Sequence, residues 1–211
     1  FSRMMPAFGD ALTVRELEAI MDHVRSFCGD DDWPRGELNL PRPLVTEKAY
    51  PEDEAVLTTA VSTGGPGSVS NEVVYERRIG ARNQVEISVP FGWRERVREG
   101  AVQDATDWTG GVGDVGVGVK RAVYHDLEKG TILSLAGEIV LPTGDEDDGF
   151  GNGTTVFEPF VSFGQILPSD AFLHAQGILE LPADTDRKGS EALWRLALGR
   201  SFTSGEWGRT W

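Results

Sequence analysis

Apolar and polar residues alternate in Val85-Glu86-Ile87-Ser88-Val89-Pro90-Phe91, where every odd-numbered position is apolar. Such a period of two is typical of a β-strand with one apolar and one polar face. The same alternation continues around residues 115–120 and returns around residues 133–141, 157–163, 173–181 and 194–198. Each run is about ten residues long, whereas strands of soluble proteins average about five or six residues. Strands that cross an outer membrane need about nine to eleven residues, so strand length favours a membrane barrel.

The connections between the predicted strands alternate in length. Short turns are predicted at residues 79–83, 125–130 and 166–170, and longer loops at 93–113, 142–153 and 182–190. Outer-membrane barrels have short periplasmic turns and longer outer loops. The sequence therefore predicts a mainly β fold, an antiparallel outer-membrane-type β-barrel of about eight strands over residues 55–211, with further strands expected to complete it.

Charged residues occupy the face opposite the apolar one. They are Glu86, Lys120, Glu138, Glu158, Glu180 and Arg195. A closed soluble core would have to pair such charges at high cost, whereas a polar, water-filled lumen tolerates them. Arg121 falls in the apolar register, and near the turn end of its strand a long side chain can reach the interface. Alternation alone leaves open which face is inside.

Glycine and turn residues recur in two segments, Gly111-Val112-Gly113-Asp114-Val115-Gly116-Val117-Gly118-Val119-Lys120 and Leu141-Pro142-Thr143-Gly144-Asp145 with Gly149-Phe150-Gly151-Asn152-Gly153-Thr154. Over about residues 110–200 the chain resembles the MetA-type family of outer-membrane barrels named after a phenol meta-pathway degradation gene product. The resemblance implies a barrel with a transport-related role.

The N-terminal residues follow a helical pattern instead. Thr13 and Glu16 have the spacing of a capping box, and Leu12 and Leu17 that of a hydrophobic staple. Apolar residues then recur every three to four positions as far as Phe27. The spacing predicts a short amphipathic helix that ends before Gly29.

Together with this helix, the run Met4-Met5-Pro6-Ala7-Phe8-Gly9 and Leu12-Thr13 resembles the C-terminal part of a class I c-type cytochrome domain, over residues 1–29. In that family the Met before Pro is the distal axial ligand of haem iron. The resemblance implies Met5 as the metal ligand and haem c as the cofactor of the intact protein. The attachment motif Cys-x-x-Cys-His is absent and Cys28 is the single cysteine, so covalent attachment within these 211 residues is excluded.

Residues 30–54 lack any apolar period and contain four prolines after Asp30-Asp31-Asp32. This composition predicts an extended, proline-rich tether. The predicted organisation is thus a cytochrome c remnant (1–29), a tether (30–54) and a barrel region (55–211).

Composition excludes several function classes. A net charge of −14 argues against nucleic acid as a partner, because cationic side chains drive that binding. Gly111-x-Gly113-x-x-Gly116 opens a strand rather than the helix that a dinucleotide fingerprint requires. Asp145 to Gly149 is expected to be a solvated outer loop rather than a calcium loop. No motif resembles a hydrolase or transferase site, so we expect no enzyme. No basic leader precedes Phe1, and any export signal is expected upstream or already removed.

The leading functional hypothesis is a haem c electron carrier, tied to an outer-membrane barrel and working at the periplasmic face. Its partners are the lipid bilayer and a periplasmic redox protein. One alternative is an outer-membrane barrel for passive transport of small or hydrophobic solutes. A second is a soluble β-sandwich binding module.

Overall fold

The computed structural model describes residues 12–27, 32–34, 36–43, 45–64, 66–96 and 107–200. The chain divides into two compact units, residues 1–33 and residues 34–211. In the first unit, α1 (Val14–Ser26) is the predicted helix. Thr13 N donates a hydrogen bond to Glu16 Oε2 (2.8 Å), and Glu16 N donates to Thr13 Oγ1 (3.4 Å), which confirms the capping box. The hydrogen bonds that Glu16 Oε2 accepts from Thr13 N and from Thr13 Oγ1 (2.8 Å) hold the pKa of the Glu16 carboxyl below its usual value. No helix in the described part of the chain has the length and apolarity to cross a membrane.

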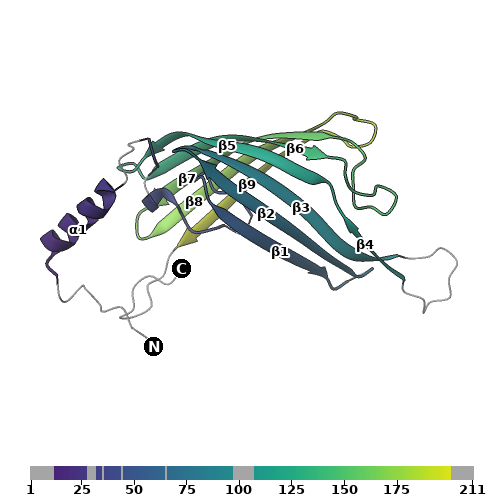
Figure 1. Ribbon diagram of the computed structural model, residues 1–211, viewed down its shortest axis with the longest axis horizontal. Helices are drawn as coiled ribbons and strands as arrows, with labels where there is room; N and C mark the ends of the chain where they lie inside the picture. Colours follow the sequence, from purple (N-terminus) through teal and green to yellow (C-terminus); the bar gives the residue numbers. More distant parts are fainter. Residues whose placement is uncertain are drawn as a thin grey trace. The chain divides into compact units, whose positions relative to one another are not determined.

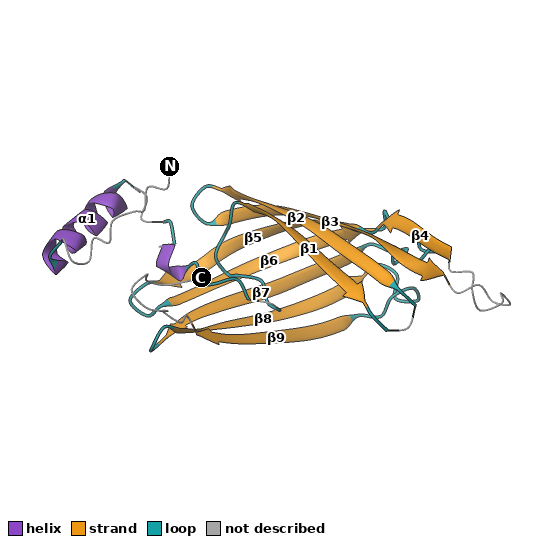
Figure 2. Ribbon diagram, turned by 90° about the horizontal axis from the view of Figure 1, so that it is seen from below, coloured by secondary structure: helices purple, strands orange, loops and turns teal. Residues whose placement is uncertain are grey.

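The second unit is one antiparallel sheet that curls into part of a barrel (Figure 1). Its strands are β1 (Glu54–Ser62), β2 (Ser68–Ile79), β3 (Asn83–Arg96), β4 (Asp107–Val112), β5 (Val115–Asp126), β6 (Thr131–Leu141), β7 (Val156–Leu167), β8 (Ala171–Pro182) and β9 (Glu191–Arg200). They pair in the order β1-β2-β3-β5-β6-β7-β8-β9. The long strands lie side by side in chain order, as Figure 2 shows. The predicted fold class is confirmed.

Strands β4 and β5 form one broken strand opposite β3. Phe91 pairs with Val112 and Ser88 pairs with Gly116, so β4 and β5 continue each other along the same neighbour. Between them, Gly113 N donates to Pro90 O (2.7 Å). Counted this way, the sheet has the predicted eight strands.

The prediction of a loop over residues 93–113 is wrong at both ends of that segment. Strand β3 continues to Arg96 and β4 begins at Asp107, and these two stretches pair as antiparallel strands. Gly110 and Gly111 hide the strand in the sequence, because a residue without a side chain contributes nothing to an apolar period.

The short turns lie where predicted, and all of them are at the end of the sheet where β1 begins. Gly80 (φ 64°) and Gly130 (φ 65°) adopt the left-handed backbone conformation that glycine permits. Ser169 (φ 61°) and Asp170 (φ 59°) form a turn with two positive φ angles, as in a type I′ hairpin. The longer connections 142–155 and 183–190 lie at the opposite end of the sheet, where the β1–β2 connection is also short.

The curl of the sheet determines which face is inside. The apolar positions point outward and stay exposed, for example Val119, Leu135, Leu196 and, at 74% exposure, Leu198. Many inward-facing positions are polar and buried, among them Gln84, Ser88, Lys120, Ser134, Ser162, His174 and Gln176. The soluble β-sandwich alternative is therefore wrong for the described residues, since its apolar faces would pack against each other. Arg121 lies exposed on the outer face near the turn end and donates to Asn83 Oδ1 (2.7 Å).

Candidate functional site

A chain segment packs on the inner face of the sheet at its short-turn edge. We call residues 36–43 and 45–53 the inner segment; it includes the short helix η2 (Gly36–Leu38). Leu38 and Ala49 of this segment are buried with Ala122 and Ile132 of the sheet in a small apolar core. Much of the stretch predicted as a tether is thus packed against the barrel region.

Polar side chains of the sheet bind the backbone of the inner segment. Ser134 Oγ donates to Ala49 O, and His174 Nε2 lies 3.2 Å from Pro41 O. Glu47 N donates to Gln176 Oε1 (3.2 Å), and Glu52 N donates to Gln84 Oε1 (2.7 Å). An irregular segment rich in proline has few backbone partners of its own, so side chains must supply them. These hydrogen bonds explain why polar residues are buried on this face.

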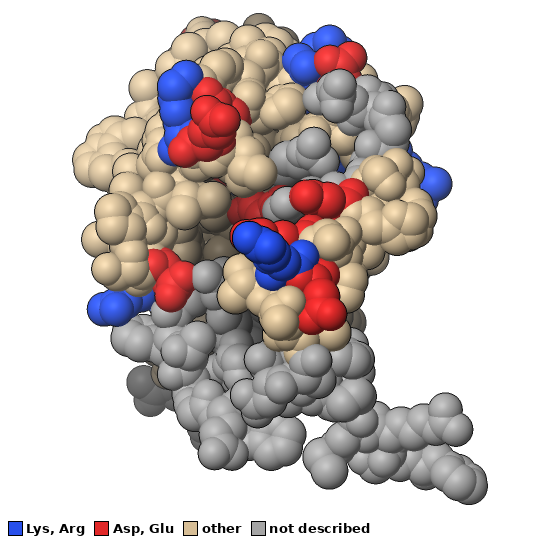
Figure 3. Space-filling view, turned by 90° about the vertical axis from the view of Figure 1, so that its left-hand side faces the viewer, with Lys and Arg blue, Asp and Glu red and all other residues tan. Residues whose placement is uncertain are grey.

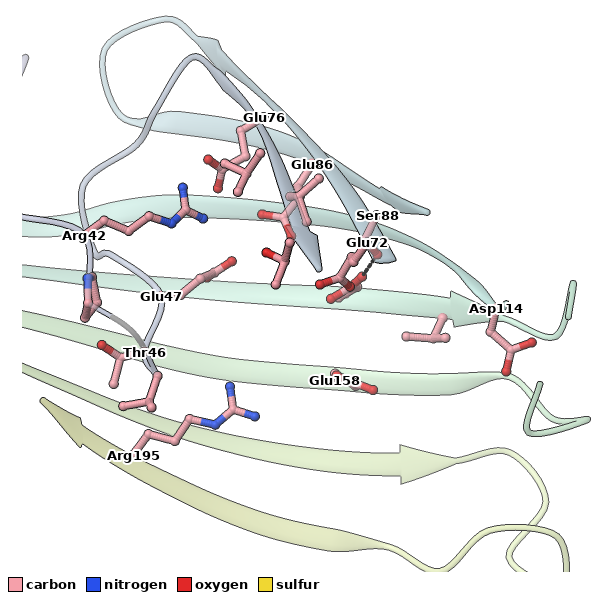
Figure 4. Close-up of a pocket in the computed structure, with 17 residues that line it drawn as sticks. Arg42, Thr46, Glu47, Glu72, Glu76, Glu86, Ser88, Asp114, Glu158 and Arg195 are labelled. Atoms are coloured by element: carbon pink, nitrogen blue, oxygen red, sulfur yellow. Dashed lines mark hydrogen bonds between the residues drawn. The ribbon is translucent and has the colours of Figure 1, made fainter. Parts of the chain in front are cut away.

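The concave face and the inner segment together line a partly open cavity of about 720 Å³ (Figure 4). Its lining includes seven carboxylate residues, Glu47, Glu72, Glu76, Glu86, Asp114, Glu138 and Glu158. Two guanidinium groups line it as well, those of Arg42 and Arg195. Figure 3 shows acidic side chains gathered in the hollow of this end of the molecule. Carboxylate side chains therefore outnumber cationic side chains in the lining of the cavity.

The most buried carboxylate is Glu76, whose side chain is 4% exposed. Its Oε1 accepts a hydrogen bond from Gln84 Nε2 (2.7 Å) and lies 3.8 Å from Lys120 Nζ. Lys120 Nζ also lies 3.9 Å from Glu47 Oε2. Carboxylate oxygens of Glu47, Glu76 and Glu86 lie within 4.8 Å of one another, an arrangement that draws cationic groups.

The other carboxylates of the cavity wall have fewer hydrogen-bond and ion-pair partners than Glu76. Ser88 Oγ donates to Glu138 Oε1 (2.8 Å), and Gln84 Nε2 donates to Glu86 Oε2 (3.4 Å). None of Glu72, Glu86, Glu138 and Glu158 forms an ion pair within 4.0 Å with another described residue.

Asp114 lies at the break between β4 and β5, where it binds the loop 142–155. Its carboxylate accepts hydrogen bonds from Gly144 N (3.0 Å), Asn152 N (2.7 Å) and Asn152 Nδ2 (3.1 Å). A Cβ on Gly151 would lie 2.7 Å from Asp114 Oδ1, so a larger residue does not fit there. Thr143 Oγ1 donates to Gly113 O (3.0 Å). The glycine-rich motifs thus join the 142–155 loop to the broken strand.

Met5, the predicted haem ligand, lies outside the described residues, so the axial ligand stays a prediction. The charged residues predicted to share one face of the sheet can be placed. Glu86, Lys120, Glu138, Glu158 and Arg195 lie on the inner face, and Glu180 pairs with Lys188 (2.6 Å).

Sequence reasoning missed Glu47 and Glu76. Glu47 lies in a segment with no period, and no short-range signal places it in the cavity. Glu76 follows Val73-Val74-Tyr75, a run whose alternation is broken because Val74 also faces inward. The glycine motif at residues 111–116 extends from the end of β4 to the start of β5. It opens a strand, as predicted, and not a helix.

Comparison with known proteins gives one finding. Residues 54–208 match the model of a family described as "Putative MetA-pathway of phenol degradation". The match begins at the first residue of β1 and includes every strand of the sheet. No curated protein and no solved structure matches the chain.

Proposed function

The chain belongs to the family described as "Putative MetA-pathway of phenol degradation", and on this basis we propose that it forms an outer-membrane β-barrel through whose polar lumen small solutes pass. One observation carries the proposal, namely a single curled sheet that is apolar outside and polar inside. Trp194 is 77% exposed and Leu198 74% exposed on its outer face. In water a continuous apolar face of this kind is unfavourable, whereas a bilayer accommodates it.

A barrel in a bilayer must also pair its strand edges, because lipid offers no hydrogen bonds to the backbone. In the described residues β1 and β9 form the two edges of the sheet. The proposal therefore includes closure of the barrel by further strands or by a second copy of the chain. The inner segment would then narrow the lumen at the short-turn side, which is the periplasmic side in the predicted topology.

Reconstitution tests the proposal. The chain is folded in detergent, checked for heat-modifiable migration and inserted into planar bilayers. We expect stepwise conductance above that of protein-free bilayers. A folded, inserted chain without conductance would refute the transport function, and a chain that folds as a monomer without detergent would refute the membrane barrel.

The family match supports transport better than electron transfer. Haem c ligated by Met5, and with it a periplasmic redox partner, remains a separate proposal for the intact protein. Reading the coding sequence immediately upstream of Phe1 tests it. An in-frame Cys-x-x-Cys-His would support haem binding, and its absence would remove the basis for it.

A further inference from the structure

We propose that the cavity on the inner face binds organic cations, that is, small molecules with ammonium or guanidinium groups. This inference rests on the proposed transport function and names its substrate class. The six carboxylates that carry it come from four strands and the inner segment. They are Glu72 and Glu76 of β2, Glu86 of β3, Glu138 of β6, Glu158 of β7 and Glu47 (Figure 4).

The charge balance of the wall favours cations. Arg42 and Arg195 are the cationic residues in the cavity lining, and Arg42 already pairs with Glu54. Glu72, Glu86 and Glu158 have no ion-pair partner among the described residues. A recess in which carboxylates outnumber cationic side chains favours ions of positive charge over ions of negative charge. Carboxylated or phenolate solutes are therefore disfavoured in this cavity.

Unsatisfied buried atoms give an independent argument. Glu76 lines the cavity and its side chain is 4% exposed, yet its Oε2 has no hydrogen-bond partner in the described part of the chain. Oε2 of Glu47, whose side chain is 26% exposed, has no hydrogen-bond partner among the described residues either. A buried carboxylate oxygen without a donor is costly. A ligand with N–H donors would supply what these oxygens lack.

The position of Lys120 favours an organic cation over a metal ion as the ligand of this cavity. Its buried ammonium lies 3.8 Å from Glu76 and 3.9 Å from Glu47, and it has no hydrogen-bond partner among the described residues. A compact metal ion at this cluster would lie beside that positive charge. An extended organic cation can instead place its charges along the wall, toward Glu86 and Glu158. A volume of about 720 Å³ is in the range of small-molecule sites.

Calorimetric titration of the detergent-folded chain tests the inference without relying on conductance. The two probes are butane-1,4-diamine and succinate, which have the same four-carbon chain and opposite charge. The cavity variant carries Glu72→Gln, Glu86→Gln and Glu158→Gln. The control variant carries Glu18→Gln, Glu128→Gln and Glu191→Gln, which remove the same charge at exposed positions.

We expect the diamine to bind the wild type and the control variant equally, and to bind the cavity variant at least about tenfold more weakly. Succinate should not bind measurably. Tighter binding of succinate than of the diamine to the wild type would overturn the inference, as would no diamine binding or equal binding to both variants. Comparing diamine and succinate binding to the wild type tests the inference even if the cavity variant fails to fold. Conductance without diamine binding would leave the transport function standing and refute the cation preference alone.

Discussion

Replacing Asp114 with alanine should destabilise the sheet far more than removing any exposed carboxylate of the same loop. The Asp114 side chain is buried and accepts three hydrogen bonds, from Gly144 N, Asn152 N and Asn152 Nδ2. Hydrogen bonds to a charged group contribute about 1.5–3 kcal/mol each, and backbone donors left without partners add to the cost. Water reaches part of this loop, so we expect a loss of about 3–5 kcal/mol in the free energy of unfolding.

Urea unfolding of the chain in lipid vesicles measures this loss. Asp147→Ala is the matched control, because Asp147 is exposed in the same loop, and its effect should stay within about 0.5 kcal/mol. Asp114→Asn keeps one acceptor oxygen and should lose about half as much as alanine. If Asp114→Ala is no more destabilising than Asp147→Ala, the carboxylate does not hold the loop on the broken strand, and our account of the glycine-rich motifs is refuted.

Three further predictions concern the outer face, the inner segment and one loop. Leu135→Lys places a charge in the middle of β6 on the outer face and should disfavour folding into vesicles by about 2–4 kcal/mol; a neutral effect would contradict a lipid-facing surface. Ser134→Ala removes a buried hydrogen bond to the inner segment and should speed cleavage by trypsin after Lys48; unchanged cleavage would show that other contacts suffice to hold the segment. The hydrogen bond from Lys188 to Glu180 raises the pKa of the lysine. The stabilisation from this pair is thus complete below the ordinary lysine pKa, and it is lost as the pH rises through the raised pKa of Lys188. Urea unfolding at neutral and strongly alkaline pH should show this loss, and Lys188→Gln should show a smaller one; identical pH profiles would count against the pair.

Local patterns in the sequence were enough for most of the strands and for the three short turns. Side chains along an extended backbone point alternately to two faces, so runs such as residues 85–91 identify strands without knowledge of the fold. Turn residues act locally as well, and the three short turns lie where the sequence places them. Glycine weakened the same signal at residues 110–111, which is why β4 was missed.

The candidate site depended on contacts between residues far apart in the chain. Alternation is symmetrical, so it separates two faces but cannot say which one curls inward. Only the curl of the sheet brings Glu76, Glu86 and Glu158 around one cavity and leaves Leu135 outside. The inner segment has no periodicity, and its place on the sheet depends on side chains such as Ser134 and His174, which lie more than eighty residues away in sequence. The sequence alone therefore determined the strands, because strand structure follows from neighbouring residues. The tertiary structure decided the lumen and its charge, because both arise from residues that only folding brings together.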